Sequence, residues 1–201
     1  MISHKFPWYS FESGLQVLYR KLVFERSLKS LGPTSFVSPF IEIMNMRNVA
    51  IGDNVYVSRG SVILAIDHYD VGVFSPSITI DDGAYLGKGV TLACAKELVV
   101  GENAVLGDNV YIADCSHSLQ DIRKSVVRQE LEVGVVKIGS RSWIGKNSVV
   151  LFDLTIGENA VVGANSFVNR SVPPYTMVCG SPAKIVKRYD LAEKRWVAAR
   201  D

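Results

Sequence analysis

A six-residue repeat runs through most of this chain and constrains its fold more than any other feature. Its units include IGDNVY at 51–56, LGKGVT at 86–91, VGENAV at 100–105 and IGENAV at 156–161. Each unit begins with an aliphatic residue and has a small or β-branched residue at its fifth position. Glycine often comes second, at positions 52, 87, 101, 107, 139, 145, 157 and 163. Because five separate blocks share this pattern, the period reflects one structural unit repeated along the chain.

A period of six excludes a regular α-helix over this region. Six residues turn an α-helix by about 600°, so successive aliphatic residues would lie roughly 120° apart around its axis. Short strands joined by tight corners fit the period instead, with one aliphatic side chain per strand pointing inward and Gly or Asn at the corners. Three such strands make one triangular coil, and the pattern predicts five full coils after a ragged first coil near 37–43.

Breaks in the repeat fall between coils, at 65–78, 93–99 and 114–137. Since stacked coils form a continuous core, extra residues must leave the stack at a corner. Loops held by a rigid scaffold are common places for functional sites. We therefore expect outward loops at these three breaks.

The repeat resembles that of the hexapeptide-repeat family over about residues 37–185. This resemblance implies an all-β fold, a left-handed parallel β-helix, whereas the period alone would also allow a right-handed β-helix or another solenoid. We expect an N-terminal amphipathic helix and cap at 1–36 and a β-helix catalytic domain at 37–185 with loops 65–78 and 114–137. A C-terminal tail helix is expected at 186–201.

The predicted N-terminal helix covers residues 10–31. Leu15, Leu18 and Leu22 fall on one stripe, and Gly32 and Pro33 end the segment. This helix either caps the β-helix by packing against it or lies on a membrane surface. The second alternative remains because the segment also has a basic side, formed by Arg20, Lys21, Arg26 and Lys29.

His117 stands where the repeat breaks, in the segment IADCSHS at 112–118, and SRSWIG at 140–145 resumes the pattern. These motifs resemble those of sugar O-acetyltransferases in the family, including maltose, galactoside and surface-polysaccharide enzymes. The resemblance implies that His117 is the general base, which takes the proton of a sugar hydroxyl as its oxygen attacks a thioester. Asp114 would orient His117 or hold the acceptor. Cys115 would be a bystander, since the family transfers the acyl group directly.

The segment NRSVPPYTMVCGSPAKIVKR at 169–188 resembles the family's exit from the β-helix. The resemblance implies acetyl-CoA as co-substrate, with Lys184 and Lys187 donating charge-assisted hydrogen bonds to its phosphates. It also places Asn169 and Arg170 along the coenzyme groove and Lys146 and Ala164 beside the pantetheine arm. Trp143 would lie against the pantetheine or the acceptor, or serve as a packing residue. In the family this groove lies between neighbouring β-helices of a homotrimer.

Asp67, His68 and Tyr69 occupy the first break, in AIDHYDVGVFSP at 65–76. They either line an acceptor pocket, as a similar loop does in some surface-polysaccharide acetyltransferases, or are ordinary loop residues. A metal site is not expected. A γ-type carbonic anhydrase needs three zinc-binding histidines, and this chain has only three in total, without the spacing His-x-x-x-x-His.

The expected function is transfer of an acetyl group from acetyl-CoA to a hydroxyl of a sugar or polysaccharide precursor. An N-acetyltransferase acting on an amino sugar or other amine, and a non-catalytic β-helix scaffold, are the alternatives. A formal net charge of +2 gives no reason to expect a nucleic-acid partner. We expect a cytoplasmic protein, at most peripheral to a membrane. No apolar run approaches the roughly 18–20 residues of a span, no secretory signal is evident, and three cysteines suit reduced thiols.

Overall fold

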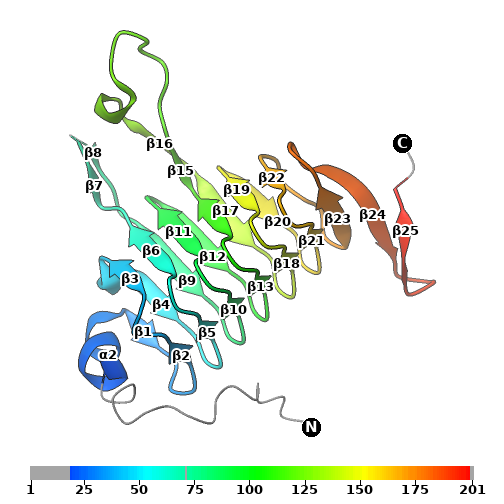
Figure 1. Ribbon diagram of the computed structural model, residues 1–201, viewed down its shortest axis with the longest axis horizontal. Coiled ribbons are helices and arrows are strands. Elements are labelled where there is room, and N and C mark those ends of the chain that lie inside the picture. The colour runs from blue at the N-terminus through cyan, green and yellow to red at the C-terminus, as the bar shows by residue number, and fades with distance from the viewer. Residues whose placement is uncertain (1–18, 71, 200–201) are drawn as a thin grey trace.

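The computed structural model describes residues 19–70 and 72–199, which form a prism with three β-sheets as its sides (Figure 1). Sheet A contains β1 (Ser30–Leu31), β4 (Val49–Ile51), β9 (Ser77–Ile80), β12 (Glu97–Val100), β17 (Val135–Ile138) and β20 (Leu154–Ile156). Sheet B contains β2 (Phe36–Val37), β5 (Tyr56–Val57), β10 (Tyr85–Leu86), β13 (Val105–Leu106), β18 (Trp143–Ile144), β21 (Val161–Val162), β23 (Thr176–Cys179), β24 (Lys184–Asp190) and β25 (Arg195–Ala198). Sheet C contains β3 (Glu42–Met44), β6 (Val62–Ala65), β11 (Thr91–Cys94), β14 (Tyr111–Ala113), β19 (Val149–Leu151) and β22 (Phe167–Val168).

The chain visits the sheets in the order A, B, C, and each circuit adds one coil. Strands β9, β10 and β11 make one circuit, and β12, β13 and β14 make the next. Equivalent strands pair in parallel and in register, so that Leu86 lies beside Leu106 and Leu92 beside Ile112. The strands of the coils therefore form three parallel ladders, which confirms the β-helix predicted from the repeat; β24 and β25, which follow the last coil in sheet B, pair antiparallel.

The repeat's aliphatic and small positions fill the interior. First-position residues such as Ile51, Leu86, Leu106 and Ile144 are at most 1% exposed. The fifth-position residues are buried beside them, including Val55, Ala84, Val90, Ala104, Val110, Ser142 and Ser148. Glycine follows the first position because the corners stack tightly: a Cβ on Gly107 would lie 2.7 Å from the backbone nitrogen of Lys146. The same six-residue unit thus supplies both the core and the corners.

The predicted C-terminal tail helix at 186–201 is wrong over its described residues. Strand β24 pairs antiparallel with β23, and β25 pairs antiparallel with β24, so the segment extends sheet B. The Asp190 carboxylate accepts hydrogen bonds from the backbone N–H groups of Ala192 and Glu193, both at 2.9 Å, and so stabilises the connecting turn. Pairing with β23 satisfies the backbone hydrogen-bonding groups at the edge of sheet B. This gain outweighs the helix propensity of the segment.

The N-terminal helix is shorter at its C-terminal end than the pattern predicts. Residues 1–18 lie outside the described part, so most of the expected stripe does too. The π-helical turn η2 (Arg20–Phe24) leads into α2 (Glu25–Ser27), and the chain then becomes extended. The segment ends early because the Lys29 N–H donates to the Val49 carbonyl, at 3.0 Å, and draws the chain into sheet A. Phe24 and Leu28 join the hydrophobic core, as a packing cap requires.

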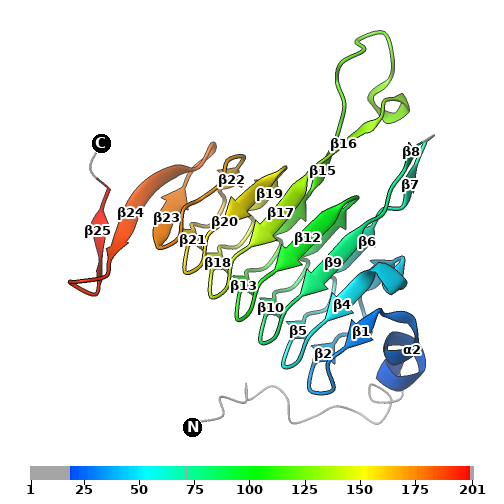
Figure 2. The same cartoon turned by 180° about the vertical axis from the view of Figure 1, so that it is seen from behind.

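Two insertions leave the prism where the chain passes from sheet C to sheet A, which we call the C–A edge. The first forms the hairpin β7 (His68–Tyr69) and β8 (Gly72–Val73). The second forms β15 (Cys115–His117) and β16 (Leu131–Val133), whose tip contains the 3-10 turn η4 (Val126–Arg128). Both project beyond the coils in Figures 1 and 2, as expected for loops 65–78 and 114–137. The break at 93–99 forms no such projection, because only Ala95 and Lys96 separate β11 from β12.

Candidate functional site

Asp114 lies at the root of the second hairpin, and its carboxylate is fully buried. It accepts hydrogen bonds from the backbone N–H groups of Ala95, Lys96 and Glu97 at 2.7–2.8 Å, all from the corner of the preceding coil. The Cys94 thiol also donates to it, at 3.1 Å. Neither role expected of Asp114, orienting His117 or holding the acceptor, fits this arrangement: the buried carboxylate joins two coils at the point where the hairpin begins. A three-residue spacing could not reveal this, because the partners come from another coil.

Replacing Asp114 by asparagine is expected to destabilise the fold by about 2–3 kcal/mol, because an amide turns one acceptor oxygen into a donor facing backbone N–H groups. Chemical denaturation followed by circular dichroism measures the loss. Asp121→Asn on the exposed tip is the matched control and should leave the unfolding midpoint nearly unchanged. Equal effects of the two substitutions would show that the buried carboxylate does not hold the hairpin.

The two cysteines beside Asp114 are poorly suited to nucleophilic catalysis. Burial first, and then the nearby Asp114 carboxylate, raise the pKa of the Cys115 thiol to about 12. The pKa of Cys94 is raised for the same reasons, burial first. Since the thiolate is the reactive form, both groups stay protonated and unreactive at neutral pH. This agrees with the expectation that Cys115 is a bystander.

His117 lies on β15 opposite Leu131, and its ring contacts a residue from the other hairpin. The Tyr69 ring centroid is 5.1 Å from that of His117, with the two planes inclined by 58°. The Nδ1 atom of His117 is buried and has no hydrogen-bond partner among the described residues. Nε2 is therefore the nitrogen left to face an acceptor. The two hairpins come from corners two coils apart, so the stacking of coils brings these rings together.

A polar pocket of about 420 Å³ lies between the two hairpins. His117 is not itself in the lining, but Tyr69, which its ring contacts, and Ser118, which follows it in the chain, are. The other polar side chains of the lining are those of Asp70, Gln120, Asp121, Lys124, Arg128, Gln129 and Glu130. Two contacts bridge it: an ion pair between Arg128 and Asp70, at 3.3 Å, and a hydrogen bond from the Tyr69 hydroxyl to the Val127 carbonyl, at 3.4 Å. Hydroxyl, amide and carboxylate groups of this kind suit a ligand rich in hydroxyls. Sequence reasoning missed Asp70 and the residues from 118–130, because no repeat or motif marks them.

The three residues expected to line an acceptor pocket separate in the structure. Tyr69 alone reaches the pocket and His117. His68 is exposed, and its Nδ1 lies 3.2 Å from Oδ1 of Asp67. The hydrogen bond with His68 lowers the pKa of Asp67, whose carboxylate lines a different pocket nearer the N-terminus. Asp67 and His68 therefore do not line the pocket beside His117.

The residues expected to bind the coenzyme are all exposed and fall on two parts of the prism. Trp143, Lys184 and Lys187 lie on sheet B, and Lys146 and Ala164 lie where the chain passes from sheet B to sheet C, which we call the B–C edge. Asn169 and Arg170 follow β22 and lie on the C–A edge, in line with the His117 hairpin. Within one chain, sheet C separates the B–C edge from His117.

Two further findings concern only the part of the chain that the structure describes. No group of three or more His, Cys, Asp or Glu residues there could hold a metal ion. No helix in 19–70 or 72–199 has the length and hydropathy needed to cross a lipid bilayer.

Comparison with known proteins identifies relatives over most of the chain. Residues 136–170 match the model of the bacterial transferase hexapeptide (six repeats). WbbJ of Escherichia coli (strain K12), whose name assigns it to O-acetyl transfer in lipopolysaccharide biosynthesis, is 32% identical over 166 residues, which cover 78% of this chain and 80% of WbbJ.

Two solved structures share the fold. The hexapeptide-repeat acetyltransferase VCA0836 of Vibrio cholerae O1 biovar eltor, complexed with acetyl coenzyme A, is 28% identical with a TM-score of 0.59, covering 88% of this chain and 79% of that one. A variant of AntD, an N-acyltransferase from Bacillus cereus, in complex with dTDP-4-amino-4,6-dideoxyglucose and coenzyme A, is 19% identical with a TM-score of 0.72, covering 89% and 90%. Motifs, coils and relatives agree: the chain belongs to the hexapeptide-repeat acyltransferase family, and its fold is that family's left-handed parallel β-helix.

Proposed function

We propose that this chain transfers an acetyl group from acetyl-CoA to a hydroxyl of a sugar or polysaccharide precursor, with His117 as general base. The observation that carries the proposal is the placement of His117 against Tyr69, beside a polar pocket between two hairpins. The name of the E. coli relative supports O-acetyl transfer, and the acetyl-CoA bound to the V. cholerae protein supports the donor.

His117 would act through Nε2, since its Nδ1 atom is buried. Acetyl-CoA supplies an acyl group activated as a thioester. Nε2 takes the proton of the acceptor hydroxyl as its oxygen bonds to the thioester carbonyl carbon and the carbon–sulfur bond breaks. The imidazolium then returns that proton to the departing thiolate, which leaves as coenzyme A and restores the neutral base. No covalent acyl-enzyme is needed, in keeping with the raised pKa of Cys115.

The exposed cations of the chain fit the phosphates of coenzyme A. Arg170, Lys184 and Lys187 are exposed and form no ion pair with any described residue. Unpaired guanidinium and ammonium groups are suited to binding phosphate oxygens through charge-assisted hydrogen bonds. Arg170, however, lies on the C–A edge and the two lysines lie on sheet B, so one bound coenzyme would have to contact two separate parts of the surface.

A homotrimer would join these two parts, with the C–A edge of one chain facing sheet B and the B–C edge of its neighbour. An apolar ladder on the outer face of sheet B supports such an association. One apolar residue of each paired strand points outward, in register along the sheet: Phe36, Tyr56, Tyr85, Val105, Trp143, Val161 and Met177. Trp143 is 54% exposed in the single chain. The other members are half-buried to exposed, and a continuous apolar strip of this kind at the surface is typical of an interface.

Release of free thiol from acetyl-CoA, measured with a panel of sugars, nucleotide sugars and amino sugars, tests the proposed reaction. Turnover is expected with acceptors that offer only hydroxyl groups, and mass spectrometry should then find an ester. Turnover with amines alone would replace O-transfer by N-transfer, the activity named for the B. cereus neighbour. Absence of turnover with every acceptor would favour the non-catalytic scaffold.

A further inference from the structure

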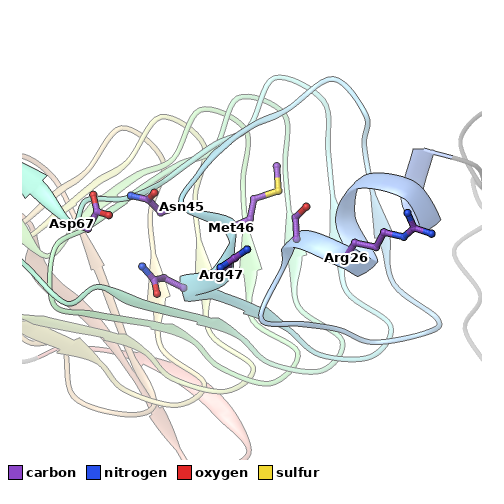
Figure 3. Close-up of a pocket in the computed structure, with 7 residues that line it drawn as sticks. Arg26, Asn45, Met46, Arg47 and Asp67 are labelled. Carbon is purple, nitrogen blue, oxygen red and sulfur yellow. The ribbon is translucent and has the colours of Figure 1, made fainter.

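A second pocket, of about 440 Å³, opens near the first coil and is not used by the proposed reaction. Helix α2 forms one side of it, and the corner after β3, which includes the 3-10 turn η3 (Met46–Asn48), forms the other. Figure 3 shows Asn45 and Asp67 at one end, Arg47 between them and α2, and Arg26 extending from the helix. The pocket therefore joins the N-terminal cap to the root of the first hairpin.

The polar groups of this pocket are mainly donors without partners. Arg26 and Arg47 are exposed, and neither forms a hydrogen bond or ion pair with any residue in the described ranges. Four other arginines do pair with carboxylates: Arg123, Arg128, Arg141 and Arg195. Ser27 and Asn48 add a hydroxyl and an amide to the lining. Arg47, with the amide of Asn48 and the hydroxyl of Ser27 in the same lining, suits a phosphate better than a neutral ligand. Figure 3 shows the Arg26 side chain directed away from Arg47, at the helix end of the pocket.

The one carboxylate in the lining already has partners. Hydrogen bonds from His68 and Asn45 lower the pKa of Asp67, so its charge is stabilised within the protein. The Asn45 amide also donates to the Ala65 carbonyl, at 2.8 Å, which keeps this end of the pocket attached to the next coil. Arg47 lies nearer the middle of the pocket and does not pair with Asp67. Its guanidinium group is therefore available to a ligand.

The pocket lies on the same edge of the prism as His117. The corner after β3 and the corner after β14 are separated by three strand spacings of sheet C, since β6 and β11 lie between them. At about 4.8 Å per spacing, the two corners are roughly 14 Å apart along the edge. Between them stand the first hairpin and Tyr69, which contacts His117. A saccharide that carries a phosphate or diphosphate group can extend over such a distance.

We propose that this pocket binds the phosphate or diphosphate group of the acceptor while a hydroxyl of its sugar lies at His117. The inference rests on the proposed acetyl transfer to a saccharide and specifies its substrate as a phosphate-linked sugar. Both a nucleoside diphosphate sugar and a lipid diphosphate sugar carry the required group. Arg47, Asn48 and Ser27 supply the donors for the phosphate that the two substrates share, and Arg26 adds a positive charge at the helix end of the pocket.

Arg47→Gln tests the pocket with matched acceptors: one saccharide as the free sugar, as a nucleoside diphosphate sugar and as a lipid diphosphate sugar in detergent. The KM for the phosphate-linked acceptor is expected to rise about 10- to 100-fold, because a charge-assisted contact is lost. The KM values for the free sugar and acetyl-CoA should stay the same. Lys194→Gln is the matched control, since Lys194 is also an exposed cation without a partner among the described residues but lies in the turn between β24 and β25, at the opposite end of the prism from the pocket (Figure 1). The diphosphate acceptor with the lower KM identifies the source of the phosphate.

The results separate this inference from the proposed function. If Arg47→Gln affects free and phosphate-linked sugars equally, or affects neither, the phosphate pocket is wrong while acetyl transfer stands. If the wild-type protein acetylates no acceptor, the proposed function fails, and calorimetric titration with inorganic pyrophosphate still decides the pocket. Binding weakened by Arg47→Gln but not by Lys194→Gln supports it; binding affected equally by the two substitutions, or by neither, shows that the anion binds elsewhere.

Discussion

Replacing His117 by glutamine should lower kcat for acetyl transfer by about 10²–10⁴-fold, the range typical for loss of a general base. Glutamine is polar and of similar size, but its amide cannot take the proton of a hydroxyl. The KM for acetyl-CoA should change little, because the cations on sheet B do not depend on the His117 hairpin. Initial rates of thiol release at saturating acetyl-CoA and acceptor measure the effect.

Cys115→Ser is the matched control for this substitution. Cys115 lies two residues away on the same strand, and its thiol is protonated at neutral pH because burial raises its pKa to about 12. The serine variant should retain nearly the full rate. A His117→Gln variant with a near-normal rate would remove His117 from the chemistry, and a Cys115→Ser variant as slow as His117→Gln would point to a covalent route.

The β-helix could be predicted from the sequence because every coil has the same packing requirements and meets them with the same types of residue. An aliphatic residue such as Leu86 or Leu106 must point inward in every strand, and the glycine after it must fit under the next corner. These demands recur every six residues, so the pattern is visible without knowledge of any contact distant in sequence. The corners at which the two hairpins leave the prism were visible for the same reason, as breaks in the period.

The C-terminal segment shows where local reasoning fails. Residues 191–199 contain good helix formers, yet this segment forms β25. Strand β24 pairs with the open edge of sheet B, and β25 pairs with β24. Whether a segment becomes a strand there depends on an unpaired neighbour that the sequence does not reveal. Tertiary hydrogen bonding outweighs intrinsic preference in such a case.

The candidate site was only partly predictable for a related reason. His117 was identified from its motif, but the partners of Asp114 lie on another coil, and the pocket beside His117 is built from two insertions some fifty residues apart in sequence. Only Tyr69, of the three residues expected from the first insertion, reaches His117. The lengths and relative directions of the two hairpins decide these contacts, and no repeat governs them.

Charge reversal on sheet B tests whether the site is divided between neighbouring chains. The double variant Lys184→Glu, Lys187→Glu reverses two charges on sheet B, and at acetyl-CoA well below the wild-type KM it should be nearly inactive. The variant His117→Gln is inactive for a different reason and keeps both lysines. If each site takes His117 from one chain and the lysines from its neighbour, the two inactive variants should complement each other when they assemble together.

Co-expression of these two variants with different affinity tags, followed by purification of the mixed oligomers, tests the account most directly. In every closed trimer that contains both variants, one of the three interfaces combines an intact His117 with intact lysines, so about a third of wild-type activity should return. Each variant alone and their mixture after separate purification, without subunit exchange, are the controls. Mixed oligomers that stay as inactive as either parent would contradict a site shared between neighbouring chains.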